Sequence, residues 1–363
     1  MKRLFAAFFA IMLIPACLFG CAPSYFVKSD AVFAGIVLDV KLYGGNPEKA
    51  YEEMVSLATE INGAISLGEP DSAINAFNES DSGKKIPVIR RVYDLVRIAK
   101  TAYAETDGAF NPCLPDVSKA WGVDNDGIAT GNPPAVFPTE EKLNALRAVA
   151  NPDLVKTDAD NGNYYISKNA DGVKLDLGGI AKGYLADEFK AIAERYNVVS
   201  GCISLSGNVI LIGRYKEGDS ERDWGVGITD PREKHAYVCG FYTQGGVSVV
   251  TSGDYERYYF SDAIRFCHVV DPFTLTPAGV ERADSGFAQK KDYVISATVR
   301  GASSSKCDAL STAVMVLGAE KGAELLERQG YDGIIFTADK KMKVVGKFDF
   351  ATSQTGYTEY ERI

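Results

Sequence analysis

Helical and strand-like patterns follow one another unevenly along this chain, and that uneven order limits the folds it can adopt. Helical periodicity recurs at Pro47–Ala64, Pro87–Ala104 and Pro138–Ala150, whereas short, glycine-punctuated strands dominate from Cys202 to Val270. A doubly wound sheet needs strands and helices to alternate regularly, as they do in βαβ units. The sequence therefore predicts an α+β fold rather than a doubly wound one.

The same periodicities predict the remaining elements. Strands are expected at Ala31–Tyr43, Tyr164–Ile166 and Val173–Leu175, and helices at Ile180–Arg195 and Ala309–Gln329, the second broken near Gly318. A closing hairpin is expected at Gly333–Val345, with irregular backbone at Ser66–Ser80 and Gly108–Asp126. No repeat of fixed period interrupts this order.

The first residues have the pattern of an export signal. Lys2 and Arg3 precede the uncharged, mostly apolar run Leu4–Leu18, which is short for a membrane-spanning helix. The run ends in Gly20-Cys21, which resembles the bacterial lipobox, where the cysteine is lipidated and becomes the new N-terminus. The alternative is an ordinary signal peptide with an incidental cysteine. We expect a lipoprotein signal at residues 1–20, a tether at 21–30 and one domain at 31–363.

Charge and cysteine content exclude several classes of protein. Cleavage before Cys21 would leave 37 basic and 48 acidic residues, a balance that disfavours nucleic-acid binding. No second apolar run is long enough to span a bilayer. The remaining cysteines are scattered, and the chain has two histidines, so neither a disulfide scaffold nor a zinc cluster is expected. Buried, unpaired cysteines are the preferred interpretation.

Asp308 and Thr312 form the first candidate site. They lie four residues apart at the start of a predicted helix, so their side chains share one face. A carboxylate and a hydroxyl are hard oxygen ligands of the kind that Mg²⁺ prefers. The alternative is that Asp308 only caps the helix.

The segment from Lys174 to Glu188 forms the second candidate site. Its sequence predicts a strand, a Gly178-Gly179 turn and a helix, and amides at a helix start attract phosphate. Lys182 adds a cation, although the segment is neither a Walker loop nor a GxGxxG motif. An ordinary tight turn between a strand and a helix remains the alternative.

His268 is the third candidate. It lies at the end of a predicted strand, just before the turn that begins at Asp271-Pro272. Histidine acts as a general base near neutral pH, and it also occurs as a purely structural residue.

Taken in order, these segments resemble the FAD:protein FMN transferase family, often called ApbE. The resemblance rests on EPDSAINAFN, GAFNPCLPDVSKAWG, DLGGIAKGY, WGVGITDP, TSGDYERY, HVVDPFT and DALSTAVMVLG, which follow one another from Glu69 onward. It extends over nearly the whole chain from Ala31. It implies an α+β fold related to the T-fold, with mixed helices and antiparallel sheets and a flavin site between two halves.

The resemblance also implies roles for individual residues. Magnesium would be bound by Asp308, Thr312 and the backbone carbonyl of Gly179, and His268 would deprotonate the acceptor hydroxyl. FAD would contact a further set: Ala34, Gly68, Ala120, Trp121, Gly122, Asp176, Lys182, Val269 and Val270. The implied reaction transfers FMN from FAD to a threonine or serine of another protein and releases AMP. Family acceptors are subunits of redox membrane complexes or extracytoplasmic flavoproteins.

The chain departs from the family pattern at two positions associated with flavin packing. Ala34-Gly35-Ile36 stands where Met-Gly-Thr is frequent, and Gly68 stands where an aromatic residue is frequent. These departures affect the expected flavin affinity more than the metal chemistry. Two alternatives remain open: an enzyme that hydrolyses FAD to FMN and AMP, and a non-catalytic flavin-binding lipoprotein.

A further segment resembles the acceptor motif of the family. Residues 349–355 come close to it and fail at Gln354, which raises the hypothesis of self-modification at Thr355. The hypothesis assumes an accessible tail near the chain end. Chance similarity in a tail rich in threonine and serine is the preferred interpretation.

Overall fold

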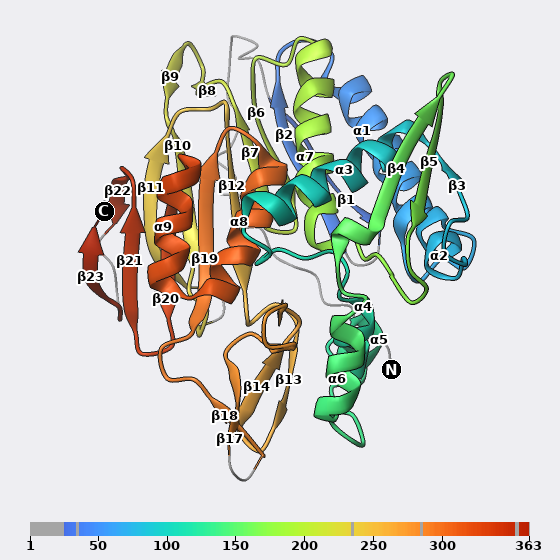
Figure 1. Cartoon of the computed structure of the whole chain (residues 1–363). Helices are drawn as coiled ribbons and strands as arrows, with labels where there is room; N and C mark the ends of the chain where they lie inside the picture. Colours follow the sequence, from blue (N-terminus) through green and yellow to red (C-terminus); the bar gives the residue numbers. More distant parts are fainter. Residues whose placement is uncertain (1–24, 34–35, 234–235, 284–285, 353–355, 363) are drawn as a thin grey trace, which may run out of the picture.

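The computed structural model describes residues 25–33, 36–233, 236–283, 286–352 and 356–362, and its centre is one nine-stranded sheet (Figure 1). Every neighbouring pair is antiparallel except the last, which is parallel. In spatial order the strands are β1 (Phe26–Phe33), β2 (Ile36–Tyr43), β6 (Ser200–Leu205), β7 (Asn208–Ile212), β12 (Val247–Gly253), β19 (Val294–Gly301), β20 (Asp332–Thr337), β21 (Lys341–Val345) and β23 (Thr358–Arg362).

Two groups of helices cover this sheet. In Figure 1, α1 (Pro47–Ile65), α3 (Arg90–Glu105) and α7 (Gly178–Arg195) lie beside the strands of one half, and α8 (Ser304–Leu317) and α9 (Ala319–Gln329) lie beside those of the other. Each group encloses its own buried apolar cluster. A third cluster packs the sheet of β10 (Trp224–Thr229), β11 (Tyr237–Thr243) and β22 (Asp349–Thr352) against β20 and β21. The predicted α+β class of mixed helices and antiparallel sheets is confirmed.

Short elements complete the chain. One small sheet contains β3 (Ile86–Val88), β5 (Asn163–Lys168) and β4 (Val155–Asp160), close to α2 (Ala73–Asn78), and another contains β8 (Tyr215–Glu217) and β9 (Ser220–Arg222). Beside the main sheet lie α4 (Pro115–Trp121), α5 (Asn125–Thr130), α6 (Glu140–Arg147), η1 (Pro152–Leu154), β13 (Tyr258–Ser261), β14 (Ile264–Cys267), β15 (Val270–Asp271), β16 (Thr276–Pro277), β17 (Val280–Ala283) and β18 (Gly286–Gln289).

Several predicted elements are confirmed for local reasons. The first long helix begins at Pro47, where the side chain of Asn46 accepts a hydrogen bond from the amide of Lys49. Gly318, with φ of 85°, separates α8 from α9, as the sequence predicts. The hairpin of β20 and β21 turns through Lys340, which adopts a positive φ of 62°.

Other predictions were wrong in detail. Phe26–Phe33 is a strand rather than a tether up to residue 30, because its backbone pairs antiparallel with β2. The expected loop at 66–80 contains α2, which Ser72 caps, and the irregular stretch at 108–126 contains α4, which begins at Pro115. Residues 173–175 do not form a strand; the side chain of Asn78 pairs with this segment instead.

The C-terminal segment also differs from expectation. Asp349–Thr352 forms β22 and pairs antiparallel with β11, so the first half of the acceptor-like motif is not a free tail. Thr355 lies outside the described residues, as do Ala34, Cys21 and the predicted signal peptide.

Three further observations concern the described residues. None of their helices is long and apolar enough to cross a bilayer. They contain no group of three or more His, Cys, Asp or Glu side chains placed to hold a metal. Their five cysteines are unpaired and, as expected, mostly buried.

Candidate active site

The site is built where α7 crosses α8. Gly183 allows the close approach, because a Cβ there would lie 2.6 Å from the carbonyl oxygen of Ser304 and 2.8 Å from the Cβ of Asp308. One turn later on α7, the carboxylate of Asp187 accepts hydrogen bonds from the amides of Ser304 and Ser305, at 2.7 and 2.9 Å. Asp187 therefore holds the first turn of α8 and, with it, the position of Asp308.

Asp308 is a buried carboxylate with one oxygen left almost free. Its side chain is 4% exposed, and its Oδ2 accepts a hydrogen bond of 2.9 Å from the amide of Gly183. The nearest cation to Oδ1 is Nζ of Lys182, at 3.7 Å. Burial raises the pKa of Asp308, while Lys182 and the Gly183 amide oppose that shift. A buried carboxylate with an underused oxygen fits a cation ligand.

Asn208 adds a second underused group beside Asp308. It lies close enough to that carboxylate to favour its ionised form, yet neither amide atom has a hydrogen bond of good geometry within the described chain. Buried amide groups are normally paired, so this side chain is consistent with a binding site that a ligand completes.

Thr312 faces the same region one turn after Asp308. Its hydroxyl lies 3.4 Å from that of Ser252 on β12, which in turn lies 2.8 Å from the hydroxyl of Ser311. Because Asp187 contacts the start of α8 and Gly183 contacts Asp308, the two helices run antiparallel. Gly179, one turn before Gly183 and exposed, therefore lies toward the Thr312 end of α8.

The loop that leads into α7 is held by side chains from α2 and β5. The amide of Asn78 accepts a hydrogen bond from the Leu175 N–H at 2.7 Å and donates one to the Leu175 carbonyl at 3.0 Å. The buried amine of Lys168 donates to the carbonyls of Asn78 and Val173, at 2.9 Å each. Asp176 follows directly, and its carboxylate accepts from the Gly178 amide at 2.8 Å. These contacts place Asp176 at the helix start.

His268 approaches from the other half of the chain. Its Nδ1 lies 3.3 Å from the carbonyl of Arg257, and its amide donates to the same oxygen at 3.1 Å. The ring is partly exposed. Burial by surrounding protein lowers the pKa of His268 far below its usual range, and the positive charges of Arg257 and Lys182 lower it further. The imidazole is therefore neutral at pH 7, which is the form a general base needs, but the same shift makes it a weaker base than a free imidazole.

Glu256 and Arg257 were not singled out from the sequence. Surrounding protein raises the pKa of Glu256, although its side chain keeps contact with solvent. The charges of Lys182 and Arg257 oppose this rise, and the charge of Asp308 adds to it. Arg257 also interacts electrostatically with Asp176. Both residues lie in the quoted segment TSGDYERY, where two charges directly after a predicted strand were the available signal.

The turn that carries these charges is fixed by a buried ion pair. Asp254 is fully buried and accepts two hydrogen bonds from the guanidinium of Arg232, at 2.7 and 2.8 Å, and one from the Tyr293 hydroxyl at 2.7 Å. A bidentate pair of this kind restricts geometry strongly. It therefore holds Glu256 and Arg257 in place beside the site.

The Trp121 loop lies next to the His268 segment, with its indole turned inward. The indole nitrogen donates to the Leu275 carbonyl at 2.6 Å, and the Trp121 carbonyl accepts from the Tyr259 hydroxyl at 2.7 Å. The ring also packs in an aromatic cluster with Phe137, Phe266 and Phe287. The indole is fully buried, so any FAD contact at Ala120-Trp121-Gly122 would involve the partly exposed Ala120 and the backbone. This contact stays a prediction.

Two other expected contacts are backbone contacts. Val269 and Val270 are buried, and their segment pairs with the strand that follows: the Val269 carbonyl accepts from Ala278 at 2.8 Å, and Val270 is the partner of Pro277. Gly68 is exposed, and within the described chain its loop forms hydrogen bonds with the side chains of Ser66 and Asn75.

Comparison with known proteins identifies the family of this chain. The ApbE family profile matches residues 34–335. The chain belongs to the ApbE family. A relative from Treponema pallidum (strain Nichols), named FAD:protein FMN transferase, is 31% identical over 327 residues, which cover 85% of this chain and 84% of the relative. A protein of the same name from Escherichia coli K12 is 28% identical and covers 73% and 70%.

Solved ApbE structures have the same fold. The apo form of the flavinyl transferase ApbE from Pseudomonas stutzeri superimposes with a TM-score of 0.71 at 26% identity, covering 91% of this chain and 95% of that one. The ApbE protein of Thermotoga maritima gives 0.72, also at 26% identity, with 91% and 97% covered. The resemblance inferred from the motifs is thus confirmed for family and fold.

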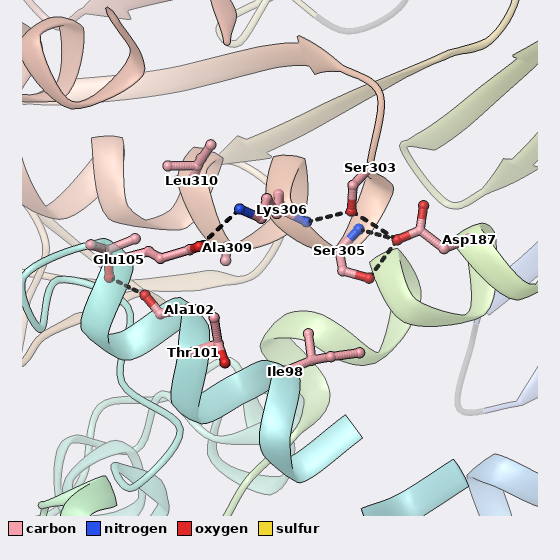
Figure 2. Close-up of a pocket in the computed structure, with 11 residues that line it drawn as sticks. Ile98, Thr101, Ala102, Glu105, Asp187, Ser303, Ser305, Lys306, Ala309 and Leu310 are labelled. Carbon is pink, nitrogen blue, oxygen red and sulfur yellow. Dashed lines mark hydrogen bonds and ion pairs between the residues drawn. The ribbon is translucent and has the colours of Figure 1, made fainter. Parts of the chain in front are cut away.

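A cavity of about 220 Å³ lies apart from the candidate site (Figure 2). Figure 2 shows it between α3 and the start of α8, with Ile98 and Ala102 on one wall and the ion pair of Lys306 with Glu105 at one end. None of the predicted FAD or metal residues lines it. Asp187 borders it, so the cavity adjoins the contacts that position α8 without forming part of the site.

Proposed function

We propose that this chain transfers FMN from FAD to a threonine or serine hydroxyl of an acceptor protein, in a magnesium-dependent reaction that releases AMP. The observation that carries the proposal is the pairing of Lys182 on α7 with Asp308 on α8, at 3.7 Å, together with His268 after β14, whose pKa is lowered by the charge of Lys182. The names of the relatives supply the reaction class.

The residues present fit a magnesium ion. Asp308 offers a buried carboxylate with an underused oxygen, Thr312 a hydroxyl on the same helix face, and Gly179 a backbone carbonyl. Oxygen ligands of this kind, completed by water and substrate phosphates, are typical of magnesium. When bound, the ion would neutralise charge on the pyrophosphate. Lys182 holds part of the compensating charge at the same place.

The chain's own residues account for binding and proton transfer. Lys182 and Arg257 attract the pyrophosphate, and the amides at the start of α7 favour an anion. Neutral His268 accepts the proton of the acceptor hydroxyl. The hydroxyl oxygen forms a bond to the FMN-side phosphorus, the bond from that phosphorus to the bridging oxygen breaks, and AMP leaves with the electron pair. The proton on His268 then passes to solvent.

We further propose that the protein is exported and anchored to a bacterial membrane through lipid on Cys21, on the extracytoplasmic side. The basis is the sequence of residues 1–21. One acyl chain gives only marginal binding, so stable anchoring requires the several chains that bacterial lipoproteins carry. The acceptor would then be a subunit of a redox membrane complex or an extracytoplasmic flavoprotein.

The test measures two products at once. FAD is incubated with the protein and an acceptor peptide of the family type, with Mg²⁺ or with EDTA, and AMP release and the mass of the peptide are followed. Transfer supports the proposal when AMP and FMN-peptide form in equal amounts and only with metal. AMP and free FMN without FMN-peptide would identify a hydrolase, and neither product would identify a binding protein.

A matched pair of lysine variants on α7 tests the phosphate site. Lys182→Ala should raise the KM for FAD, because it removes a cation beside Asp308. Lys190→Ala is the control, since that side chain lies two turns away and contacts the Gly246 carbonyl at 3.5 Å. Equal kinetics for the two variants would contradict the assignment of Lys182.

A further inference from the structure

Asn208 lies in the sheet at the place where the two helices of the site meet. It begins β7 and follows a two-residue turn, in which Ser206 and Gly207 have positive φ angles of 43° and 99°. Asn208 pairs with Leu205 on β6 and with Val250 on β12, and β7 contacts both α7 and α8 (Figure 1). A slip of one residue would turn the side chain to the other face of the sheet, so this register fixes its direction.

The amide group of Asn208 is buried without a protein partner. The side chain is 1% exposed, and neither its nitrogen nor its oxygen has a hydrogen bond of good geometry to any described residue. Buried amides are normally paired, because an unpaired donor or acceptor loses its bonds to water without replacement. The strand register prevents the side chain from turning outward. The missing partner is then a bound group rather than a protein group.

Asp308 decides which end of this amide is free. Asn208 lies close enough to that carboxylate to favour its ionised form. An ionised carboxylate only accepts hydrogen bonds, so the amide nitrogen of Asn208 faces it and the amide oxygen is left for another group. Oδ2 of Asp308 accepts from the Gly183 amide at 2.9 Å, and Oδ1 lies 3.7 Å from Nζ of Lys182. The nitrogen of Asn208 therefore adds a further contact that holds the carboxylate.

The surroundings of the free amide oxygen are rich in acceptors. Glu256 lies over the same turn, since its Oε1 is 4.0 Å from the position that a Cβ on Gly207 would occupy. The charges of Glu256 and Asp308 act on each other. Two carboxylates and an amide oxygen thus lie near one another. Such a surplus of oxygen acceptors fits a hydrated cation, because Mg²⁺ usually keeps several water molecules and each of these donates hydrogen bonds.

We propose that Asn208 is a positioning residue for magnesium: its amide nitrogen holds the carboxylate of Asp308, and its amide oxygen accepts a hydrogen bond from a water molecule of the ion. This inference rests on the proposed function, which supplies the ion. Partners of this kind around metal ligands typically change metal affinity by about 10–100-fold. Asn208 thus lowers the stability of the metal-free protein and raises its affinity for the ion.

The experiment compares stability and metal affinity in the same variants. Asn208→Leu has nearly the same shape as the wild type but no polar atoms at this position. Without metal it should melt at the wild-type temperature or higher, and it should bind Mg²⁺ at least tenfold more weakly. Affinity is obtained from the rise in melting temperature as Mg²⁺ is added, with and without FAD and without an acceptor. Electron paramagnetic resonance of Mn²⁺ serves as a second probe.

Asn208→Asp keeps an acceptor oxygen at the same place. It should bind Mg²⁺ at least as tightly as the wild type, because a carboxylate also accepts hydrogen bonds from water. Its melting temperature without metal should fall, because a second carboxylate then lies beside Asp308. This variant decides the question even if Asn208→Leu does not fold.

A buried hydroxyl elsewhere in the sheet supplies the matched control. Thr298 is fully buried on β19, and its hydroxyl lies 2.8 Å from that of Thr251. Thr298→Val removes a paired polar group, so it should lower the melting temperature and leave the affinity for Mg²⁺ unchanged. This result would be the reverse of the one expected for Asn208→Leu.

Each other outcome has one meaning. Wild-type affinity for Mg²⁺ in Asn208→Leu would overturn the proposal, and so would a clear loss of stability in the metal-free form of that variant. Equally weak binding by Asn208→Asp would show that the oxygen has no role, and would overturn it too. Absence of Mg²⁺ binding by the wild type, with FMN transfer undiminished in EDTA, would instead remove magnesium from the proposed function and this inference with it.

Discussion

Asn78 offers a test of how the start of α7 is positioned. Its amide donates one hydrogen bond to the carbonyl of Leu175 and accepts one from the Leu175 N–H, and Leu175 has no exposed surface. In Asn78→Ala both backbone groups lose their partner, at about 1–3 kcal/mol each, so the free energy of unfolding should fall by about 2–6 kcal/mol. The fold should survive, because Lys168 donates to the backbone carbonyl of residue 78, which the substitution leaves in place.

The effect on the site should exceed the effect of lost stability alone. Leu175 directly precedes Asp176, and Gly179 follows at the first turn of α7, so release of this segment should displace a predicted FAD contact and a predicted metal ligand. We expect the KM for FAD to rise at least tenfold, about 1.4 kcal/mol. Urea unfolding and steady-state kinetics measure the two effects separately.

A variant of similar instability provides the control. Met342 is fully buried on β21 in the cluster on the far side of the sheet, and Met342→Ala should cost about 2–5 kcal/mol without touching the site. If Asn78→Ala and Met342→Ala show the same KM for FAD and the same magnesium dependence, Asn78 stabilises the fold only. The positioning argument would then be wrong.

Four further predictions follow from the site and the chain start. Asp308→Asn should abolish AMP release yet leave the melting temperature unchanged or raised, because it removes a buried charge whose desolvation is costly; clear destabilisation would contradict this. His268→Gln should slow transfer about 10²–10⁴-fold. The pKa of His268 is lowered in the folded protein, so below about pH 6.5 only the unfolded chain gains this proton. The free energy of unfolding of the wild-type protein without FAD should therefore fall as the pH drops below about 6.5, and that of His268→Gln should depend less on pH over that range. Gly183→Val should cost about 1–3 kcal/mol by forcing α7 away from α8, seen as a lower urea midpoint; an unchanged midpoint would show that the crossing is loose. Cys21→Ser should move the protein from the membrane to the soluble fraction, and retention would indicate an uncleaved N-terminal anchor.

Local patterns in the sequence were sufficient for much of the fold. The helices around Met54, Leu185 and Leu325 follow from apolar periodicity, and the break at Gly318 follows from a residue suited to positive φ. Asp308 and Thr312 could be paired because four residues on one helix always share a face.

Features that depend on distant residues could not be predicted in the same way. Residues 173–175 have an apolar alternation typical of a strand, but their partner is a side chain 97 positions earlier. Glu256 and Arg257 follow the end of β12 and Asn208 begins β7, and no spacing in the sequence shows that these positions meet. Phe26–Phe33 alternates only weakly, so its pairing with β2 was not evident from its own residues.

The pairing of β7 with β12 has a consequence for how the enzyme cycles. Four consecutive residue pairs join the half that carries α7 to the half that carries α8, within one uninterrupted sheet. A hinge between these halves would break that ladder of backbone hydrogen bonds. The spacing between Gly179 and Asp308 is therefore preset by the fold, and we expect no rotation of the two halves as rigid bodies during turnover.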